Sequence, residues 1–170
     1  MAESSIRNGA PDLRAEAPRR NAGSFFEIEA WMPSEIKAIS PLVDRLMRLI
    51  KGSCCVAGEE AAIELALDEA LDNAVVHGNR MVSQKLVQVL CRCEPVKGIS
   101  IVVKDQGQGF DPGAVPDPTA PENIGAEHGR GIWLMKSVMD EVCFECGGTE
   151  VRMRKAPTGQ AVTECDSPMK

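Results

Sequence analysis

The sequence predicts a single α+β domain in which helices and short antiparallel strands share one core. Residues 59–78 carry apolar side chains at the three- to four-residue spacing of a half-buried helix. Residues 85–94 and 99–103 are short runs of branched side chains joined by a compact reversal, as in antiparallel strands. With 170 residues and 44% hydrophobic content, the chain can bury one sizeable core. We therefore expect three segments: a disordered tail over residues 1–23, the domain over residues 24–155, and a second disordered tail over residues 156–170.

The most clearly delimited element is the helix expected over residues 59–78. Its apolar side chains form a buried stripe: Ile63, Leu67, Ala70 and Ala74. Glutamates occupy its first turn, and Gly78 is expected to end it as a left-handed cap. Glu69 and Asn73 lie one turn apart on an adjacent face. A carboxylate and an amide oxygen at this spacing can bind a hard cation and position a hydroxyl group.

Proline, glycine and apolar periodicity delimit the remaining elements. Pro41 is expected to kink or divide the helix in which it lies. Trp133 is expected in the buried core of its helix, without a role in function. The other expected elements are an edge strand over residues 24–32, a helix over residues 34–52, a helix from residue 132 with Ile132, Met135, Val138 and Met139 buried, and a hairpin of residues 141–146 and 149–154.

Three glycine-containing turns lie between these elements. Asp105-Gln106-Gly107-Gln108-Gly109 ends a strand, Gly129-Arg130-Gly131 opens a helix, and Gly147-Gly148-Thr149 precedes the last strand. Each turn alone is also typical of an ordinary loop. Residues 112–128 contain four prolines and no apolar period, which is typical of a lid, a binding loop or a disordered loop. Together with the E-x-x-x-N helix, this order of turns predicts one ligand site.

Composition excludes several classes of protein. A net charge of −6 without a clustered basic face argues against nucleic-acid binding. No window of about 18 uninterrupted apolar residues occurs, and the N-terminus lacks the apolar segment of a signal peptide. We therefore expect a soluble cytoplasmic protein that does not bind membranes.

Seven cysteines are expected to be reduced thiols, most of them buried or partly buried. Cys143 and Cys146 form a C-x-x-C, but on a strand these positions point to opposite faces, which argues against a metal or redox pair.

The motifs resemble those of the GHKL ATPase superfamily, and most closely those of the anti-sigma factor serine kinases, over about residues 25–155. The Walker-type G-x-x-x-x-G-K-[ST] loop is absent from the sequence. The resemblance implies a Bergerat-type two-layer sandwich, with a mixed, mostly antiparallel sheet and helices on one face. ATP is then expected between the sheet and the helices.

The resemblance also implies roles for individual residues. Asn73 corresponds to the amide that holds Mg²⁺, Glu69 to the acid that accepts the hydroxyl proton, and Asp105 to the acid that receives the adenine amino group. Gly107 and Gly109 correspond to the glycines that allow close packing of the base and sugar. The other implied cofactor contacts are Gly129, Arg130 and Gly131 at the phosphates and Thr149 near the adenine.

The expected function is that of an ATP- and Mg²⁺-dependent protein serine kinase. The resemblance implies a homodimer that binds a sigma factor and phosphorylates an anti-anti-sigma factor with a STAS-type domain. The alternative is a binding module in which ATP presents a partner surface without phosphotransfer. A sensor histidine kinase is not supported, because long dimerisation helices do not fit in the first ~24 residues.

Overall fold

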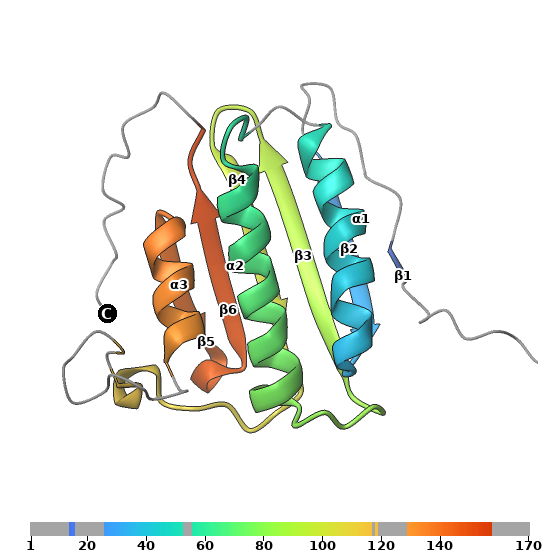
Figure 1. Cartoon of the computed structure of the whole chain (residues 1–170), viewed down its shortest axis with the longest axis vertical. Coiled ribbons are helices and arrows are strands. Elements are labelled where there is room, and N and C mark those ends of the chain that lie inside the picture. Colours follow the sequence, from blue (N-terminus) through green and yellow to red (C-terminus); the bar gives the residue numbers. More distant parts are fainter. Residues whose placement is uncertain (1–13, 16–25, 53–55, 117, 119–128, 158–170) are drawn as a thin grey trace, which may run out of the picture.

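The computed structural model describes residues 14–15, 26–52, 56–116, 118 and 129–157. These residues form two layers, in which three α-helices lie side by side on one face of a single sheet (Figure 1). This arrangement confirms the predicted α+β sandwich with helices on one face. In the described part of the chain, no helix is long and apolar enough to cross a membrane.

The sheet has the strand order β1-β2-β3-β4-β6-β5. Its strands are β1 (Arg14–Ala15), β2 (Phe26–Pro33), β3 (Leu86–Glu94), β4 (Gly98–Lys104), β5 (Glu141–Glu145) and β6 (Glu150–Lys155). Every pairing among the described strands is antiparallel, so the mixed sheet expected from the resemblance is uniformly antiparallel here. The last strand, β6, lies between β4 and β5, which makes β5 an edge strand.

The helices begin and end close to the predicted positions. Pro41 lies in the first turn of α1 (Ile39–Lys51), where a missing N–H removes no intrahelical bond. A separate 3₁₀ turn, Ile36–Ala38, precedes it, so the predicted helix is divided before the proline. The central helix, α2 (Glu60–Asp72), continues as the π-helical segment η2 (Asn73–Gly78). The last helix is α3 (Arg130–Val138).

The core lies between the helices and the sheet. Side chains of β2 alternate between buried and half-buried, as a strand with one covered face requires. The buried face of α2 packs over the middle of the sheet (Figure 1). Its buried residues are Ile63, Ala66, Leu67, Ala70 and Leu71, which confirms the predicted stripe.

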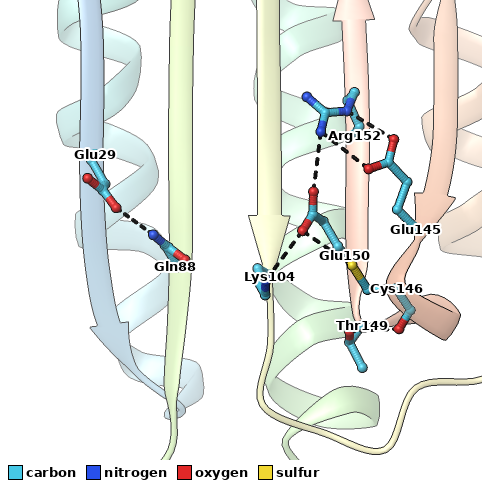
Figure 2. A network of polar contacts seen from close by, with 8 residues as sticks. All are labelled: Glu29, Gln88, Lys104, Glu145, Cys146, Thr149, Glu150 and Arg152. Atoms are coloured by element: carbon cyan, nitrogen blue, oxygen red, sulfur yellow. Dashed lines mark hydrogen bonds and ion pairs between the residues drawn. The ribbon is translucent and has the colours of Figure 1, made fainter.

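The sheet face without helices carries polar pairs between neighbouring strands (Figure 2). Gln88 on β3 donates a 2.5 Å hydrogen bond to Glu29 on β2. Arg152 on β6 pairs with Glu145 on β5 at 3.2 Å and with Glu150 at 3.4 Å. Such exposed pairs contribute about 0–1 kcal/mol each, so the buried face provides most of the stability.

Two local predictions are wrong. Gly78 is not a left-handed cap, because Asn79 follows with a φ of −81° and the left-handed residues are Arg80 and Met81, both with a φ of 55°. Trp133 is 44% exposed rather than part of the core. It lies on the side of α3 away from the buried Met135.

The cysteines divide into different environments. Cys91 is buried as expected, and burial raises the pKa of its thiol to about 12. Cys143 and Cys146 are exposed, contrary to the prediction, because they lie on the edge strand β5 and in the turn after it. The expectation of reduced thiols is wrong for Cys93, which is buried and disulfide-bonded.

The N-terminal segment departs from the prediction at one place. Arg14 and Ala15, inside the expected tail of residues 1–23, pair with Trp31 and Ala30 on the outer side of β2. A strand edge offers unpaired backbone groups that a short segment can satisfy whatever its composition. The rest of that tail, the start of the strand expected at residue 24, and residues 158–170 lie outside the described residues.

Candidate functional site

A cavity of about 660 Å³ lies between α2, η2, the start of α3 and the ends of β4 and β6. Its size is within the range of small-molecule and cofactor sites. The structure brings eight of the nine predicted site residues to its wall: Glu69, Asn73, Asp105, Gly109, Gly129, Arg130, Gly131 and Thr149. The ninth, Gly107, does not line it, and a Cβ there would collide with the Gly78 carbonyl oxygen.

One end of the cavity is formed where α3 approaches α2. A Cβ on Gly131 would lie 2.5 Å from Glu69 Oε2 and 3.4 Å from Asn73 Nδ2. A larger residue at position 131 would therefore displace the Glu69 carboxyl group, whereas glycine leaves space for it. The helices place a carboxylate, an amide and the N–H groups of a helix start in one region of the cavity.

The environment of Glu69 raises the pKa of its carboxyl group. Burial raises the pKa of Glu69, and the negative charges of Asp72 and Asp68 raise it further. A carboxylate with a raised pKa is a stronger base than an ordinary glutamate. Glu69 is thus suited to accept a proton from a bound hydroxyl group.

Asn73 provides the amide at this end of the cavity. Its Nδ2 atom is buried and has no hydrogen-bond partner among the described residues. An unsatisfied buried N–H donor costs about 1–3 kcal/mol, a cost that an acceptor oxygen of a bound group would remove. Described residues form no cluster of three or more His, Cys, Asp or Glu for a metal. One amide oxygen beside a cavity fits Mg²⁺, which proteins bind through few side chains and the phosphates of a substrate.

The start of α3 offers hydrogen-bond donors to an anion. Gly129 caps the helix with a φ of 91°, a left-handed angle that glycine adopts without strain. Arg130 follows it at the cavity wall. Free N–H groups and the positive end of the helix dipole favour phosphate here.

Asp105 also lies on the cavity wall, directly after β4 and against Gly78. Its backbone N–H donates to the Thr149 carbonyl at 3.0 Å, and its Oδ1 accepts from the Gly107 N–H at 2.6 Å. A Cβ on Gly78 would lie 2.5 Å from Oδ2, so the carboxyl group rests against the backbone of that glycine. Burial raises the pKa of Asp105, although the Gly107 hydrogen bond and the charge of Lys85 lower it. The Gly107 hydrogen bond and the contact with Gly78 orient the carboxyl group beside the cavity.

Two turns interlock beside Asp105. The N–H of Phe110 donates to the Gly147 carbonyl at 3.0 Å. Gly109 has a φ of 73°, and a Cβ at this position would collide with the Gly147 carbonyl oxygen. The Thr149 hydroxyl lies beside the Cys146 carbonyl and donates to it at 3.1 Å (Figure 2). This bond turns Oγ1 toward the turn, whereas the residue as a whole lines the cavity.

Sequence reasoning missed an aromatic wall. The rings of Phe110 and Phe144 line the cavity with centroids 5.4 Å apart in an edge-to-face arrangement. Aromatic side chains offer a planar base an apolar surface. Phe110 directly follows Gly109, which was an available signal, whereas Phe144 is brought there only by the position of β5. Most of the lid predicted over residues 112–128 lies outside the described residues, but Ala114, Val115 and Pro116 line the cavity.

Comparison with known proteins identifies the class. Residues 32–155 match the family model of the histidine kinase-like ATPase domain, and the chain belongs to this family. The serine-protein kinase RsbW of Staphylococcus epidermidis is 35% identical over 99 residues, which cover 54% of this chain and 62% of that protein. The same values hold for RsbW from two strains of that species. The matched region thus spans less than two thirds of the length of these relatives.

Proposed function

We propose that this protein is an ATP- and Mg²⁺-dependent protein serine kinase. The observation that carries the proposal is the approach of Gly131 to Glu69 and Asn73 in a cavity whose wall also includes Asp105. Glu69, Asn73 and the N–H groups at the start of α3 would surround the triphosphate. The Asp105 carboxylate would meet the adenine. The similarity to a serine-protein kinase supports the same reading.

Each residue would have a separate role in phosphoryl transfer. Asn73 would hold Mg²⁺, which supplies charge neutralisation for the phosphates when bound. The first-turn N–H groups of α3 and Arg130 would orient the same phosphates. Glu69 would accept the proton of the attacking serine hydroxyl. Asp105 would accept a hydrogen bond from the adenine amino group and so select adenine over guanine.

The proposed protein substrate is an anti-anti-sigma factor with a STAS-type domain, and the second partner is a sigma factor. This assignment rests on the resemblance of the motifs to those of anti-sigma factor kinases. A homodimer belongs to the same proposal, because β1 covers β2 only at Ala30 and Trp31 among the described residues. No other described residue pairs along this edge of β2, and an unpaired strand edge can bind another strand. Analytical ultracentrifugation of the whole chain measures the oligomeric state.

Phosphotransfer from labelled ATP to the antagonist tests the kinase assignment. Glu69→Gln is expected to lower the rate by about 10²- to 10⁴-fold, the usual contribution of a positioned base, while ATP binding persists. The matched control is Glu64→Gln, on the same helix but outside the cavity. A Glu69→Gln protein as active as the wild type would remove Glu69 from the mechanism. ATP binding without any labelled antagonist would favour an ATP-gated binding module.

A further inference from the structure

Three residues outside the cavity wall form a closed ring of hydrogen bonds. The Asn79 side-chain amide donates from Nδ2 to the Leu86 carbonyl at 3.1 Å. The Leu86 N–H donates to Gln106 Oε1 at 2.8 Å. The Gln106 N–H donates to Asn79 Oδ1 at 2.8 Å. The ring joins the chain after η2, the start of β3 and the loop after β4.

The burial of Asn79 indicates that this ring matters to the fold around it. Asn79 is fully buried, and Ser34 is the other buried polar residue in the described part of the chain. A buried amide is costly unless both its oxygen and its nitrogen are satisfied, as they are here. Asn79 directly precedes a strained stretch, since Arg80 and Met81 both have left-handed angles without being glycine. The ring holds this turn closed.

The position of the ring connects it to the proposed adenine contact. Asn79 directly follows Gly78, and Gln106 directly follows Asp105. A Cβ on Gly78 would lie 2.4 Å from Asp105 Cγ, so the carboxyl group of Asp105 lies directly against Gly78. A hydrogen bond between Asn79 and Gln106 therefore fixes the two backbones on either side of the Asp105 carboxyl group.

We propose that Asn79 and Gln106 are positioning residues for recognition of the exocyclic amino group of adenine. They touch no ligand themselves. Through the ring they keep Asp105 at the place and angle at which its carboxylate meets that amino group, so that the loop is already ordered when nucleotide binds. The inference rests on the proposed function, because it needs ATP to be the ligand and Asp105 to contact its base.

Gln106→Met and Asn79→Asp break the ring at different bonds. Gln106 is exposed, so methionine removes the acceptor for the Leu86 N–H with little risk to the fold. Aspartate at position 79 keeps the acceptor for Gln106 but has no donor for the Leu86 carbonyl. Gln106→Glu keeps an acceptor and is expected to restore binding. Gln108→Met is the matched control, because Gln108 is an exposed glutamine of the same loop outside the ring.

The experiment measures calorimetric dissociation constants for Mg-ATP and for the magnesium complex of purine riboside triphosphate, which lacks the exocyclic amino group. The wild type is expected to prefer ATP. Each ring-breaking variant is expected to raise the dissociation constant for Mg-ATP about fivefold, the equivalent of one hydrogen bond. The dissociation constant for the analogue is expected to stay unchanged. Loss of the preference in Gln106→Met and its return in Gln106→Glu would support the inference.

Two other outcomes would overturn it, and they are distinguishable. If the ring-breaking variants weaken the binding of ATP and of the analogue equally, or weaken neither, the ring supports the fold alone and does not position Asp105. If the wild type itself binds ATP no better than the analogue, the adenine contact of the proposed function fails, and the inference fails with it.

Discussion

Two glycines at the site are needed for the space they leave rather than for their backbone angles. Gly78 and Gly131 both lack a left-handed φ, yet a Cβ at either position would collide with a carboxylate. In the sequence, Gly78 looked like a helix cap and Gly131 like part of a phosphate turn. The contact that explains each glycine comes from a residue distant in the chain, Asp105 or Glu69.

Gly78→Ala is expected to displace the Asp105 carboxyl group and to raise the dissociation constant for Mg-ATP roughly tenfold or more. The reason is overpacking, which costs about 1–3 kcal/mol. Titration calorimetry measures the change. Gly52→Ala is the control, because a Cβ there would meet only backbone oxygens at 3.6 Å. Unchanged ATP affinity in Gly78→Ala would contradict the contact.

Asp72→Asn is expected to move the acidic limb of the phosphotransfer rate to lower pH. The negative charge of Asp72 raises the pKa of Glu69, so its removal lowers that pKa, and the active carboxylate persists in more acidic solution. Phosphotransfer rates measured from pH 4 to pH 8 locate the acidic limb of the pH–rate profile. Glu94→Gln removes a remote charge and is expected to leave the limb in place. A shift to higher pH after Asp72→Asn would refute the electrostatic assignment.

At the scale of elements, α2 determines both the core and the site. Its buried face meets the sheet, while Glu69 and, one turn later, Asn73 face the cavity. The segment from Asn73 to Gly78 is π-helical, a form often found at functional sites. The wider turn carries the chain into the buried Asn79 instead of a left-handed cap, which is why the predicted end of the helix was wrong.

Leu67→Ala is expected to lower the free energy of unfolding by about 2–5 kcal/mol, because it leaves a cavity beneath α2. Leu67 is fully buried, whereas Leu65 on the same helix is 36% exposed. Leu65→Ala is therefore expected to change stability by only about 0.5 kcal/mol. Urea unfolding followed by circular dichroism compares the two. Equal losses would show that α2 does not pack as described.

At the scale of the whole molecule, the cavity exists only in the folded chain. Its wall combines α2 and η2, the ends of β4 and β6, and the start of α3. Asn73 and Asp105, which would contact the two ends of the nucleotide, are far apart in sequence and share a wall because η2 packs against the end of β4. A ligand that binds there must stabilise the folded state.

Mg-ATP at a hundred times its dissociation constant is expected to stabilise the protein by about 2.7 kcal/mol, and the same concentration of Mg-GTP by much less. Differential scanning calorimetry measures the rise in melting temperature. Asp105→Asn is expected to abolish the difference between the two nucleotides. Asp44→Asn, an exposed change on α1, is expected to preserve it. Equal stabilisation by ATP and GTP in the wild type would contradict adenine recognition.

Much of the fold was predictable because periodicity is local. The buried stripe of α2, the strands β3 and β4 and the final hairpin each follow from the spacing of apolar residues within one segment. The glycine turns were equally visible, as was the spacing of Glu69 and Asn73. Their roles with ATP and Mg²⁺ stay predictions for the experiments above.

The sequence by itself determined most of the helices and strands between residues 24 and 155, and which residue types are available for nucleotide chemistry. Only the tertiary structure decided that Gly131 meets Glu69, that Gly78 meets Asp105, and that Phe144 reaches the cavity. These contacts depend on β6 lying between β4 and β5 and on α3 packing beside α2. Pairing of strands and packing of helices join residues distant in the chain, and no local spacing encodes which partners they choose.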